Sequence, residues 1–481
     1  MSPPLIQPSL YGQWAKSAWR KPSKRRLNPL YVTYCLTFHN ASGWHPLPTH
    51  SEGQHTKGPP PMTNVRDFGA TGDGRTDDTK SLRHAVEQGG GALEFPRGTY
   101  RLTAPLEINL DAHGPISLHG QGNTARILMD GPGPAIRLVG THRKSADPAS
   151  FEPRVWQHQR LPTIQGLEIV GNHDQADGIE LDGTMQPTIV GVAIRRCRYG
   201  VHLINVNRNL LLANSHIYDG RGAAIGVYFD GVNIHQAIIS GSHISYCKHA
   251  GIKASKSEIR NFQITGCDIE YNFGASEGES ADIWIDAREG TVREGTIASN
   301  TIQARPSDGG SNVRIEGAQR SDSGSVGLWN ITGNVIQSQE VNVLLRDCRG
   351  ITLTGNSFIA STKRTLVLER CANIVVGSNI FDNNRDYKGT HISGIQILGS
   401  NSVNLQNLIL SGSIAGNARE GGAIEVADSG EVLIVGCQIL DPEFRGIDIR
   451  KSRNVKVSDC QILDRRTPPK MIQALRTDET A

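Results

Sequence analysis

Two aspartates in the middle of the chain have a spacing that would suit acid–base catalysis. Asp230 and Asp286 fall at the same outward position of a repeating strand, two repeats apart. Parallel strands stack at about 4.8 Å, so the two backbones would lie about 9.6 Å apart. This is near the upper end of the roughly 6.5–9.5 Å between the carboxyl groups of an inverting glycosidase, in which one protonates the leaving oxygen and the other activates water.

Glu316 and Lys253 complete the predicted catalytic set. Glu316 lies one repeat beyond Asp286, so we expect like charges to raise one carboxyl pKa and to keep that acid protonated. Lys253 falls between the two aspartates. It would hold the carboxylate of an acidic sugar, or act as a base if burial lowered its pKa.

Five further residues of the same rows would bind the ligand. Two are aromatic rings, which offer flat platforms for sugars, and three carry groups that pair with carboxylates or line the ends of the site. They are Tyr228, Trp284, His202, Arg314 and Arg346. The alternative is a solvated sheet face with cross-strand ion pairs, such as one between Arg314 and Asp286.

A repeat must place these residues in rows. Cys437-Gln438-Ile439-Leu440 returns as Cys460-Gln461-Ile462-Leu463 after 23 residues. Earlier repeats carry the same inward apolar residue, which is isoleucine in every repeat but one. The column reads Ile169, Ile194, Ile217, Ile244, Ile269, Ile302, Ile336, Phe358, Ile380, Ile409, Ile439 and Ile462. Two residues before it runs a column that is mostly Asn, Ser or Cys, a pattern typical of a β-solenoid and not of a β-sandwich.

Each repeat contains a second strand of the pattern Gly-Ile-x-Ile. The residues between its inward positions must point outward, and they form the rows described above. The longest insertions fall just before this strand, at residues 271–281, 382–394 and 411–423. Insertions that gather on one face of a solenoid often mark its binding face.

The segment from Val65 to Thr79 begins the patterned region. It reads V-R-D-F-G-A-T-G-D-G-R-T-D-D-T and is followed by G-A-L-E-F-P-R-G-T-Y at residues 91–100. A helix is predicted at Thr79–Gln88, with Leu82, Ala85 and Val86 on one apolar face that would cover the open end of the core. We expect Asp73, Asp77 and Asp78 to serve turns and caps and not catalysis.

These residues resemble the N-terminal motif of the pectate-lyase-like, rhamnogalacturonase and epimerase-type superfamily. The resemblance implies an all-β, right-handed parallel β-helix of about a dozen coils, with loops that wall a glycan groove on the first parallel sheet. Polygalacturonase-type members carry N-T-D, D-D, G-H-G and R-I-K motifs in successive coils, and none stands intact here. Polygalacturonase activity is therefore not expected.

The two ends of the chain lie outside the repeat. Residues 1–61 are rich in Pro, Lys and Arg and predict a disordered leader, with either Met1 or Met62 as the start. This leader resembles an export signal only weakly, so the compartment stays open. A secreted or periplasmic location is one of the alternatives. The β-helix domain is predicted at residues 62–465, with a cap at 62–100, and residues 466–481 as a C-terminal tail.

Composition limits the partners. The net charge of +3 gives no electrostatic case for nucleic acid, and no run of 18 apolar residues exists that would span a membrane. The eight cysteines predict buried free thiols, although stacked pairs could be bridged. No metal ligands are assigned and no cofactor is expected, apart from Ca²⁺ if the chain is a lyase. The oligomeric state stays open.

Two classes of function follow from the sequence. The first is an enzyme, a glycoside hydrolase or polysaccharide lyase, that acts on an acidic, uronate-containing polysaccharide or oligosaccharide in a groove on the Gly-Ile-x-Ile sheet. The second is a carbohydrate-binding or adhesive β-helix without catalysis, because a fold does not fix a function.

Overall fold

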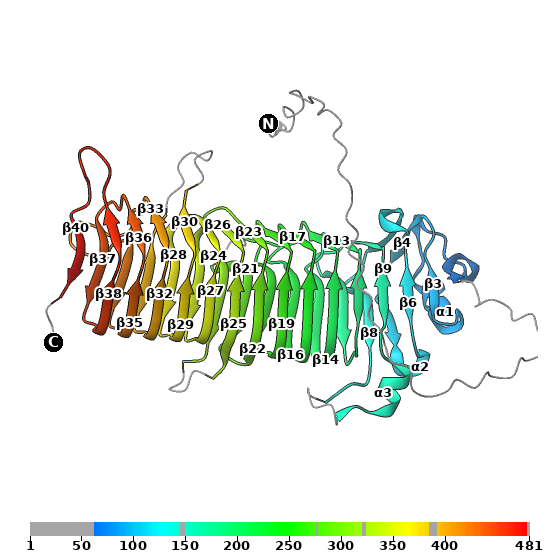
Figure 1. Cartoon of the computed structure of the whole chain (residues 1–481). Coiled ribbons are helices and arrows are strands. Elements are labelled where there is room, and N and C mark those ends of the chain that lie inside the picture. The colour runs from blue at the N-terminus through cyan, green and yellow to red at the C-terminus, as the bar shows by residue number, and fades with distance from the viewer. Residues whose placement is uncertain (1–61, 145–149, 275–277, 320–323, 384–391, 479–481) are drawn as a thin grey trace, which may run out of the picture. The chain divides into compact units, whose positions relative to one another are not determined.

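The chain from residue 62 onward winds into a right-handed β-solenoid (Figure 1). The computed structural model describes residues 62–144, 150–274, 278–319, 324–383 and 392–478. The predicted leader at residues 1–61 and parts of the predicted insertions at 271–281 and 382–394 lie outside these ranges. The solenoid has about 15 turns, a few more than the dozen predicted. The additional turns lie before the isoleucine column, which Ile127 and Tyr100 continue toward the N-terminus.

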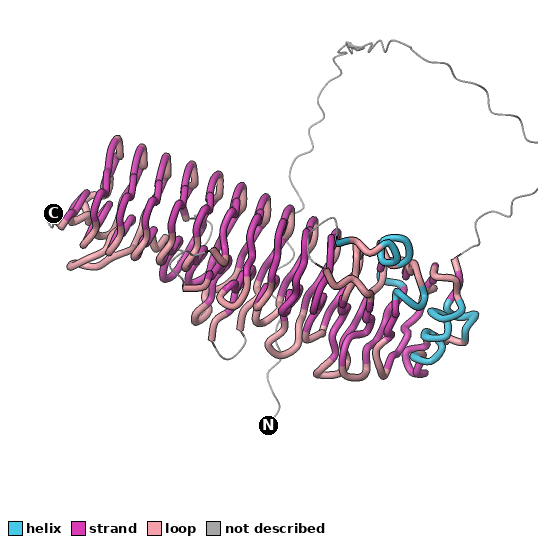
Figure 2. Tube along the Cα trace, turned by 90° about the horizontal axis from the view of Figure 1, so that it is seen from below, coloured by secondary structure: helices cyan, strands magenta, loops and turns pink. Residues whose placement is uncertain are grey.

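Three parallel sheets make up each turn, and strands of successive turns form parallel rows (Figure 2). Sheet I holds the Gly-Ile-x-Ile strands, sheet II the strands that follow them, and sheet III the strands of the isoleucine column. Four long strands pass from one sheet into the next: β14 (Tyr199–Ala213), β16 (Ile225–Ser240), β26 (Val335–Arg346) and β28 (Ser357–Glu369).

Sheet I contains the first parts of β14 and β16, the last parts of β26 and β28, and ten shorter strands. These are β5 (Leu106–Asn109), β8 (Gly133–Val139), β11 (Ala176–Asp182), β18 (Ala250–Ser255), β21 (Ser280–Ala287), β24 (Gly310–Gly317), β31 (Ile395–Leu398), β34 (Ile424–Ala427), β37 (Arg445–Arg450) and β40 (Gln473–Thr477).

Sheet II contains the last parts of β14 and β16 and the following shorter strands. They are β1 (Thr63–Asn64), β3 (Ala92–Glu94), β6 (Ser117–His119), β9 (Thr163–Gln165), β12 (Thr188–Val190), β19 (Glu258–Thr265), β22 (Thr291–Ala298), β25 (Val326–Thr332), β27 (Arg349–Thr354), β29 (Ala372–Gly377), β32 (Asn401–Gln406), β35 (Gly430–Val435) and β38 (Arg453–Ser458).

Sheet III contains the first parts of β26 and β28 and the remaining strands. They are β2 (Asp73–Asp77), β4 (Gly98–Leu102), β7 (Ala125–Met129), β10 (Glu168–Gly171), β13 (Ala193–Arg195), β15 (His216–Tyr218), β17 (His243–Ser245), β20 (Asp268–Glu270), β23 (Thr301–Gln303), β30 (Ile380–Asp382), β33 (Ile409–Ser411), β36 (Gln438–Leu440) and β39 (Gln461–Leu463).

The helices gather at the N-terminal end of the solenoid (Figure 2). They are η1 (Val65–Phe68), α1 (Thr79–Gln88), η2 (Gly122–Thr124), α2 (Leu110–His113) and α3 (Pro153–His158). Helix α1 has the predicted bounds, and its predicted apolar face is buried. The Asp78 carboxylate accepts hydrogen bonds from backbone N–H groups of the preceding loop at 2.7 and 3.0 Å. Asp78 therefore holds the preceding turn, while Asp77 Oδ1 accepts the N–H of the first helical residue, Thr79, at 3.1 Å.

Two positions of the predicted isoleucine column are wrong by one residue. Phe381 and Leu410 occupy the column, and both are fully buried. Ile380 and Ile409 point outward and are 47% and 38% exposed. Both residues of each pair are apolar, so the alternation alone could not fix the register. The Phe381 ring stacks on Phe358 of the previous turn, with centroids 4.6 Å apart, and this contact favours the observed register.

A buried ladder of asparagines joins the turns between sheets II and III. Asn300, Asn334, Asn356 and Asn379 stand at equivalent positions of successive turns. In the first three of these asparagines, the side-chain Nδ2 donates to the Oδ1 of the next asparagine at 3.0 Å. The same Oδ1 also accepts a backbone N–H. The ladder therefore satisfies the buried polar groups of these turns.

The last described strand extends the solenoid beyond the predicted domain end at residue 465. Strand β40 pairs with β37 in parallel, with Leu475 opposite Ile447. Part of the predicted C-terminal tail therefore continues sheet I.

We predict that Asn334→Ala lowers the free energy of unfolding by about 1–3 kcal/mol, because it leaves buried donors of Asn300 without an acceptor. The matched control is Asn330→Ala at an exposed position of the adjoining strand β25, which should change stability by less than about 0.5 kcal/mol. Urea unfolding followed by circular dichroism measures both. Equal effects of the two substitutions would contradict the role of the ladder.

Candidate functional site

The strand register confirms that the two predicted outward rows lie on sheet I. The first row reads Glu180, His202, Tyr228, Lys253, Trp284, Arg314 and Leu344 on successive strands. The second reads Asp182, Ile204, Asp230, Ser255, Asp286, Glu316 and Arg346. Asp230 and Asp286 each pair with Ser255, so they stand two strands apart as predicted.

Glu316 lies at the centre of a buried ion-pair network. Its carboxylate is fully buried and accepts hydrogen bonds from Arg314 Nε at 2.7 Å, Arg346 Nη1 at 2.8 Å and Trp284 Nε1 at 3.2 Å. Burial alone would raise the pKa of Glu316, but the hydrogen bond and charge of Arg314 outweigh it and lower that pKa. The expectation that like charges would keep an acid protonated here is wrong, because the neighbouring arginines outweigh the other carboxylates.

Each of the two predicted catalytic aspartates has a hydrogen-bond partner that favours its ionised form. Asp286 accepts two hydrogen bonds from Arg288, at 2.7 and 2.6 Å, and these lower its pKa despite its burial. The Asp286–Arg314 pair weighed in the sequence analysis does not form. Asp230 accepts a hydrogen bond from His202 Nε2 at 3.2 Å, which lowers the pKa of Asp230. None of the predicted catalytic carboxyl groups is therefore held protonated.

The two predicted aromatic platforms differ in access. Trp284 is only 4% exposed, with Lys253 Nζ 4.0 Å and the Arg314 guanidinium carbon 4.8 Å from its ring centroid. These cations come from the strands on either side, so they cover opposite faces of the indole and leave no face for a sugar. Tyr228 is partly exposed and stacks on His202, with centroids 5.5 Å apart. Burial raises the pKa of Tyr228 to about 12, so its hydroxyl keeps its proton.

Lys253 has a partner that the sequence did not reveal. Its Nζ lies 2.9 Å from Nε2 of His249, in the loop before β18. Burial and the charge of Lys253 lower the pKa of His249 to about 4, so the imidazole is neutral and accepts the hydrogen bond. Burial also lowers the pKa of Lys253. This direction meets the condition set for Lys253 to act as a base.

A cavity of about 480 Å³ opens among the loops that lead from sheet III to sheet I. Its lining residues are Asp219, Tyr246, Lys248, Tyr271, Phe273, Gly274 and Arg305. The rings of Tyr246 and Tyr271 stack with centroids 5.4 Å apart, and Arg305 lies over the Tyr271 ring at 5.8 Å. The sequence analysis missed this cavity. The available signal was that each tyrosine follows an isoleucine of the column by two residues.

Three family models match separate parts of the chain. Residues 62–133 match "Rhamnogalacturonase A/epimerase, pectate lyase-like", residues 155–297 match "Right handed beta helix region", and residues 324–472 match "Periplasmic copper-binding protein (NosD)". With the observed solenoid, these matches establish the class: the chain is a right-handed parallel β-helix protein. Its N-terminal part is similar to the pectate-lyase-like superfamily, as the motif at Val65–Thr79 indicated.

Curated relatives match a shorter segment. Alginate lyase 7 of Azotobacter vinelandii is 33% identical over 129 residues, which cover 25% of this chain and 14% of that protein. Mannuronan C5-epimerase AlgE4 of the same organism is 30% identical over 137 residues, 27% of this chain and 23% of that protein. The chain thus matches less than a quarter of the length of either relative.

Among solved structures, the Dettilon tailspike protein superposes with a TM-score of 0.52 at 12% identity, over 83% of this chain and 68% of that one. This likeness concerns the fold alone. Within the described ranges, no helix is long and apolar enough to cross a membrane.

We predict that His202 titrates near pH 9, well above its ordinary value of 6.5. Burial favours the neutral ring, but hydrogen bonds and charges from Asp230 and Glu180 outweigh it. Because the folded-state pKa is raised, the resulting stabilisation is fully present below about pH 6.5 and is lost as the pH rises through about 9. NMR titration of the ring protons measures this pKa, and Asp230→Asn should lower it. A midpoint near 6.5 in the unsubstituted protein would contradict the assignment.

The same linkage predicts that His202→Gln destabilises the protein most near pH 6, and that the difference from wild type shrinks toward pH 10. Denaturant unfolding at a series of pH values checks this. A difference that grows with pH would show that the neutral imidazole is the stabilising form.

Proposed function

We propose that this protein acts on a uronate-containing polysaccharide by removing a proton from the sugar carbon next to the carboxylate. The observation that carries the proposal is the Lys253–His249 pair, a lysine with lowered pKa hydrogen-bonded to a neutral imidazole. In such a pair the amine gives up its proton more readily than an ordinary lysine does, which is the property that a general base needs. The lyase form of the predicted enzyme is thus better supported than the hydrolase form, which needs a protonated carboxylic acid.

Elimination at this site would proceed through groups on the neighbouring strands β16 and β18 and on the loop before β18. The Lys253–His249 pair takes the proton from the sugar carbon, and the electrons of that C–H bond form a carbon–carbon double bond. The bond to the leaving glycosidic oxygen breaks, and that oxygen takes a proton from the Tyr228 hydroxyl. Tyr228 pairs with Lys253 in the sheet register, so acid and base would face the same sugar ring. If a proton is instead delivered to the opposite face of the carbon and the glycosidic bond stays intact, the result is epimerisation.

The remaining predicted residues would then have supporting roles. Asp230 holds His202 beside Tyr228, while Asp286 is paired with Arg288. Glu316, Arg314 and Trp284 form the buried network that positions Lys253. Arg346 is partly exposed at the edge of this network, where it pairs with Glu316 and Glu369, and a uronate carboxylate would share it with these glutamates.

One comparison and one feature of the structure support an acidic glycan as the substrate. The matched relatives are named as an alginate lyase and a mannuronan epimerase, and the loop cavity combines stacked tyrosines with Lys248 and Arg305. Aromatic faces bind sugar rings and cations bind carboxylates. The same cavity favours the second candidate, a binding protein without catalysis, because it offers a sugar site that needs no acid or base.

We predict that Lys253→Met lowers the rate of elimination by about 10²–10⁴-fold, as expected for loss of a general base. The matched control, Lys256→Met, changes an exposed lysine in the turn after the same strand and should keep the wild-type rate. Alginate, polygalacturonate and neutral glycans are incubated with the protein, with Ca²⁺ or with EDTA. Ultraviolet absorbance of unsaturated products and reducing ends are then measured together.

The outcomes of this assay separate the alternatives. Absorbance and reducing ends together indicate a lyase, reducing ends alone a hydrolase, and deuterium uptake from D₂O into an uncleaved chain an epimerase. Binding without any of these supports the second candidate. Full activity of Lys253→Met would overturn the role given to the pair.

We predict separately that Tyr246→Ala weakens binding of an active acidic oligosaccharide, as loss of a stacking surface would. The expected change is a rise in the dissociation constant of about five- to tenfold, or roughly 1 kcal/mol. Calorimetric titration with the wild type and with Tyr218→Ala, at a sheet III position one residue before Asp219, gives the comparison. Equal affinities of wild type and Tyr246→Ala would show that the cavity is not part of the glycan site.

A further inference from the structure

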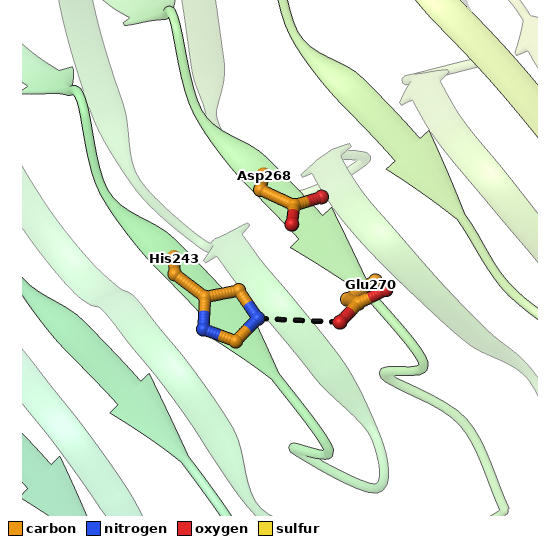
Figure 3. A group of neighbouring side chains, drawn as sticks. All are labelled: His243, Asp268 and Glu270. Atoms are coloured by element: carbon orange, nitrogen blue, oxygen red, sulfur yellow. Dashed lines mark hydrogen bonds and ion pairs between the residues drawn. The ribbon is translucent and has the colours of Figure 1, made fainter. Parts of the chain in front are cut away.

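Sheet III carries a cluster of one imidazole and two carboxylates on its outer face (Figure 3). His243 on β17 pairs with Asp268 on the neighbouring strand β20, and Glu270 lies two residues further along β20 on the same face. One nitrogen or oxygen atom from each side chain lies within 4.8 Å of the others. His243 Nε2 is 3.3 Å from Glu270 Oε1.

The two carboxylates of this cluster lack the balancing cation that sheet III supplies elsewhere. In the part of the chain that the structure describes, Glu270 has His243 as its ion-pair partner, and Asp268 makes no side-chain hydrogen bond or ion pair. By contrast, Glu168 on the same sheet lies between Arg126 and Arg195 of the neighbouring strands.

Neighbouring side chains hold two of the three groups in place. The Gln303 amide donates to Oε2 of Glu270, which leaves Oε1 directed at His243. The His216 ring packs edge-on against the His243 ring, with centroids 5.8 Å apart. Contacts of this kind orient the ligands of metal sites.

We propose that His243, Asp268 and Glu270 bind a divalent transition-metal ion, with Zn²⁺ as the best match. One imidazole and two carboxylates form a mixed nitrogen and oxygen set, which suits Zn²⁺ and related ions. Ca²⁺ and Mg²⁺ prefer ligand sets made of oxygen alone. A fourth position remains for water. The sequence analysis assigned no metal ligands, and these residues lie outside the segment matched by the copper-binding family model.

The bound ion would join two turns of the solenoid at the entrance to the loop cavity. Tyr246 follows β17 by one residue and Tyr271 follows β20 by one residue. An ion that fixes these two strands to each other therefore also fixes the stacked pair of rings. The inference is independent of the proposed catalytic activity, because the three ligands lie on sheet III and the base pair belongs to sheet I and its flanking loop.

The test is calorimetric titration of the full chain with ZnCl₂ after removal of metal by EDTA and dialysis. We expect one site that is weakened at least about tenfold by each of His243→Gln, Asp268→Asn and Glu270→Gln. His158→Gln is the matched control, since it removes an exposed imidazole at the end of α3 that is not part of the cluster, and it should keep the wild-type affinity. Circular dichroism of the metal-free proteins checks that every variant is folded.

Two further readouts do not depend on the variants. Zn²⁺ should raise the melting temperature of the wild type, and Co²⁺ should give visible absorption bands that Zn²⁺ abolishes and Ca²⁺ does not. Absence of stoichiometric Zn²⁺ binding by the wild type would overturn the proposal. Affinity unchanged by all three ligand substitutions, or lost equally with His158→Gln, would show that Zn²⁺ binds at other histidines and would also overturn it.

Discussion

Parallel stacking of one turn on the next is the constraint on which the rest of this structure depends. Each residue of a strand has its equivalent about 4.8 Å above and below it, so the side chains of every row meet their own kind or a complement. Inside, this stacking aligns apolar residues and the asparagine ladder. Outside, charges must alternate along each row or be paired with the next row, because like charges at this spacing repel.

The outer face of sheet I shows how this constraint shapes the chemistry. Glu316, Asp230 and Asp286 on this face stand beside arginines or a histidine, on the same segment or on a neighbouring strand, so their pKa values fall. Lys253 differs from these groups because its neighbour is a neutral imidazole and an indole face. A buried amine without a close carboxylate partner is a poorer proton holder, and this is the physical reason that Lys253 stands out from its row.

The edge between sheets III and I is the second place where the regular pattern is relaxed. The loops there vary in length, and they carry His249 and the residues that line the 480 Å³ cavity. Sheet III itself presents His243, Asp268 and Glu270 just before these loops begin. The features with unbalanced charge or open space thus gather where the repeat is least strict, which is where a solenoid can change its surface without losing its core.

The sequence alone determined the parallel β-helix and both outward rows of sheet I, because the repeat can be read directly from the residues. It also determined the bounds of helix α1, from the capping residues and the apolar face of that segment. It did not determine the register at Phe381 and Leu410, where two adjacent apolar residues satisfy the same alternation. It also could not find His249 or predict the direction of the Glu316 pKa. His249 reaches Lys253 only because the loop before β18 folds back over the row, and Arg346 reaches Glu316 from a position 30 residues later in the chain. Periodicity assigns the face on which a side chain lies, whereas only the folded turns decide what touches it.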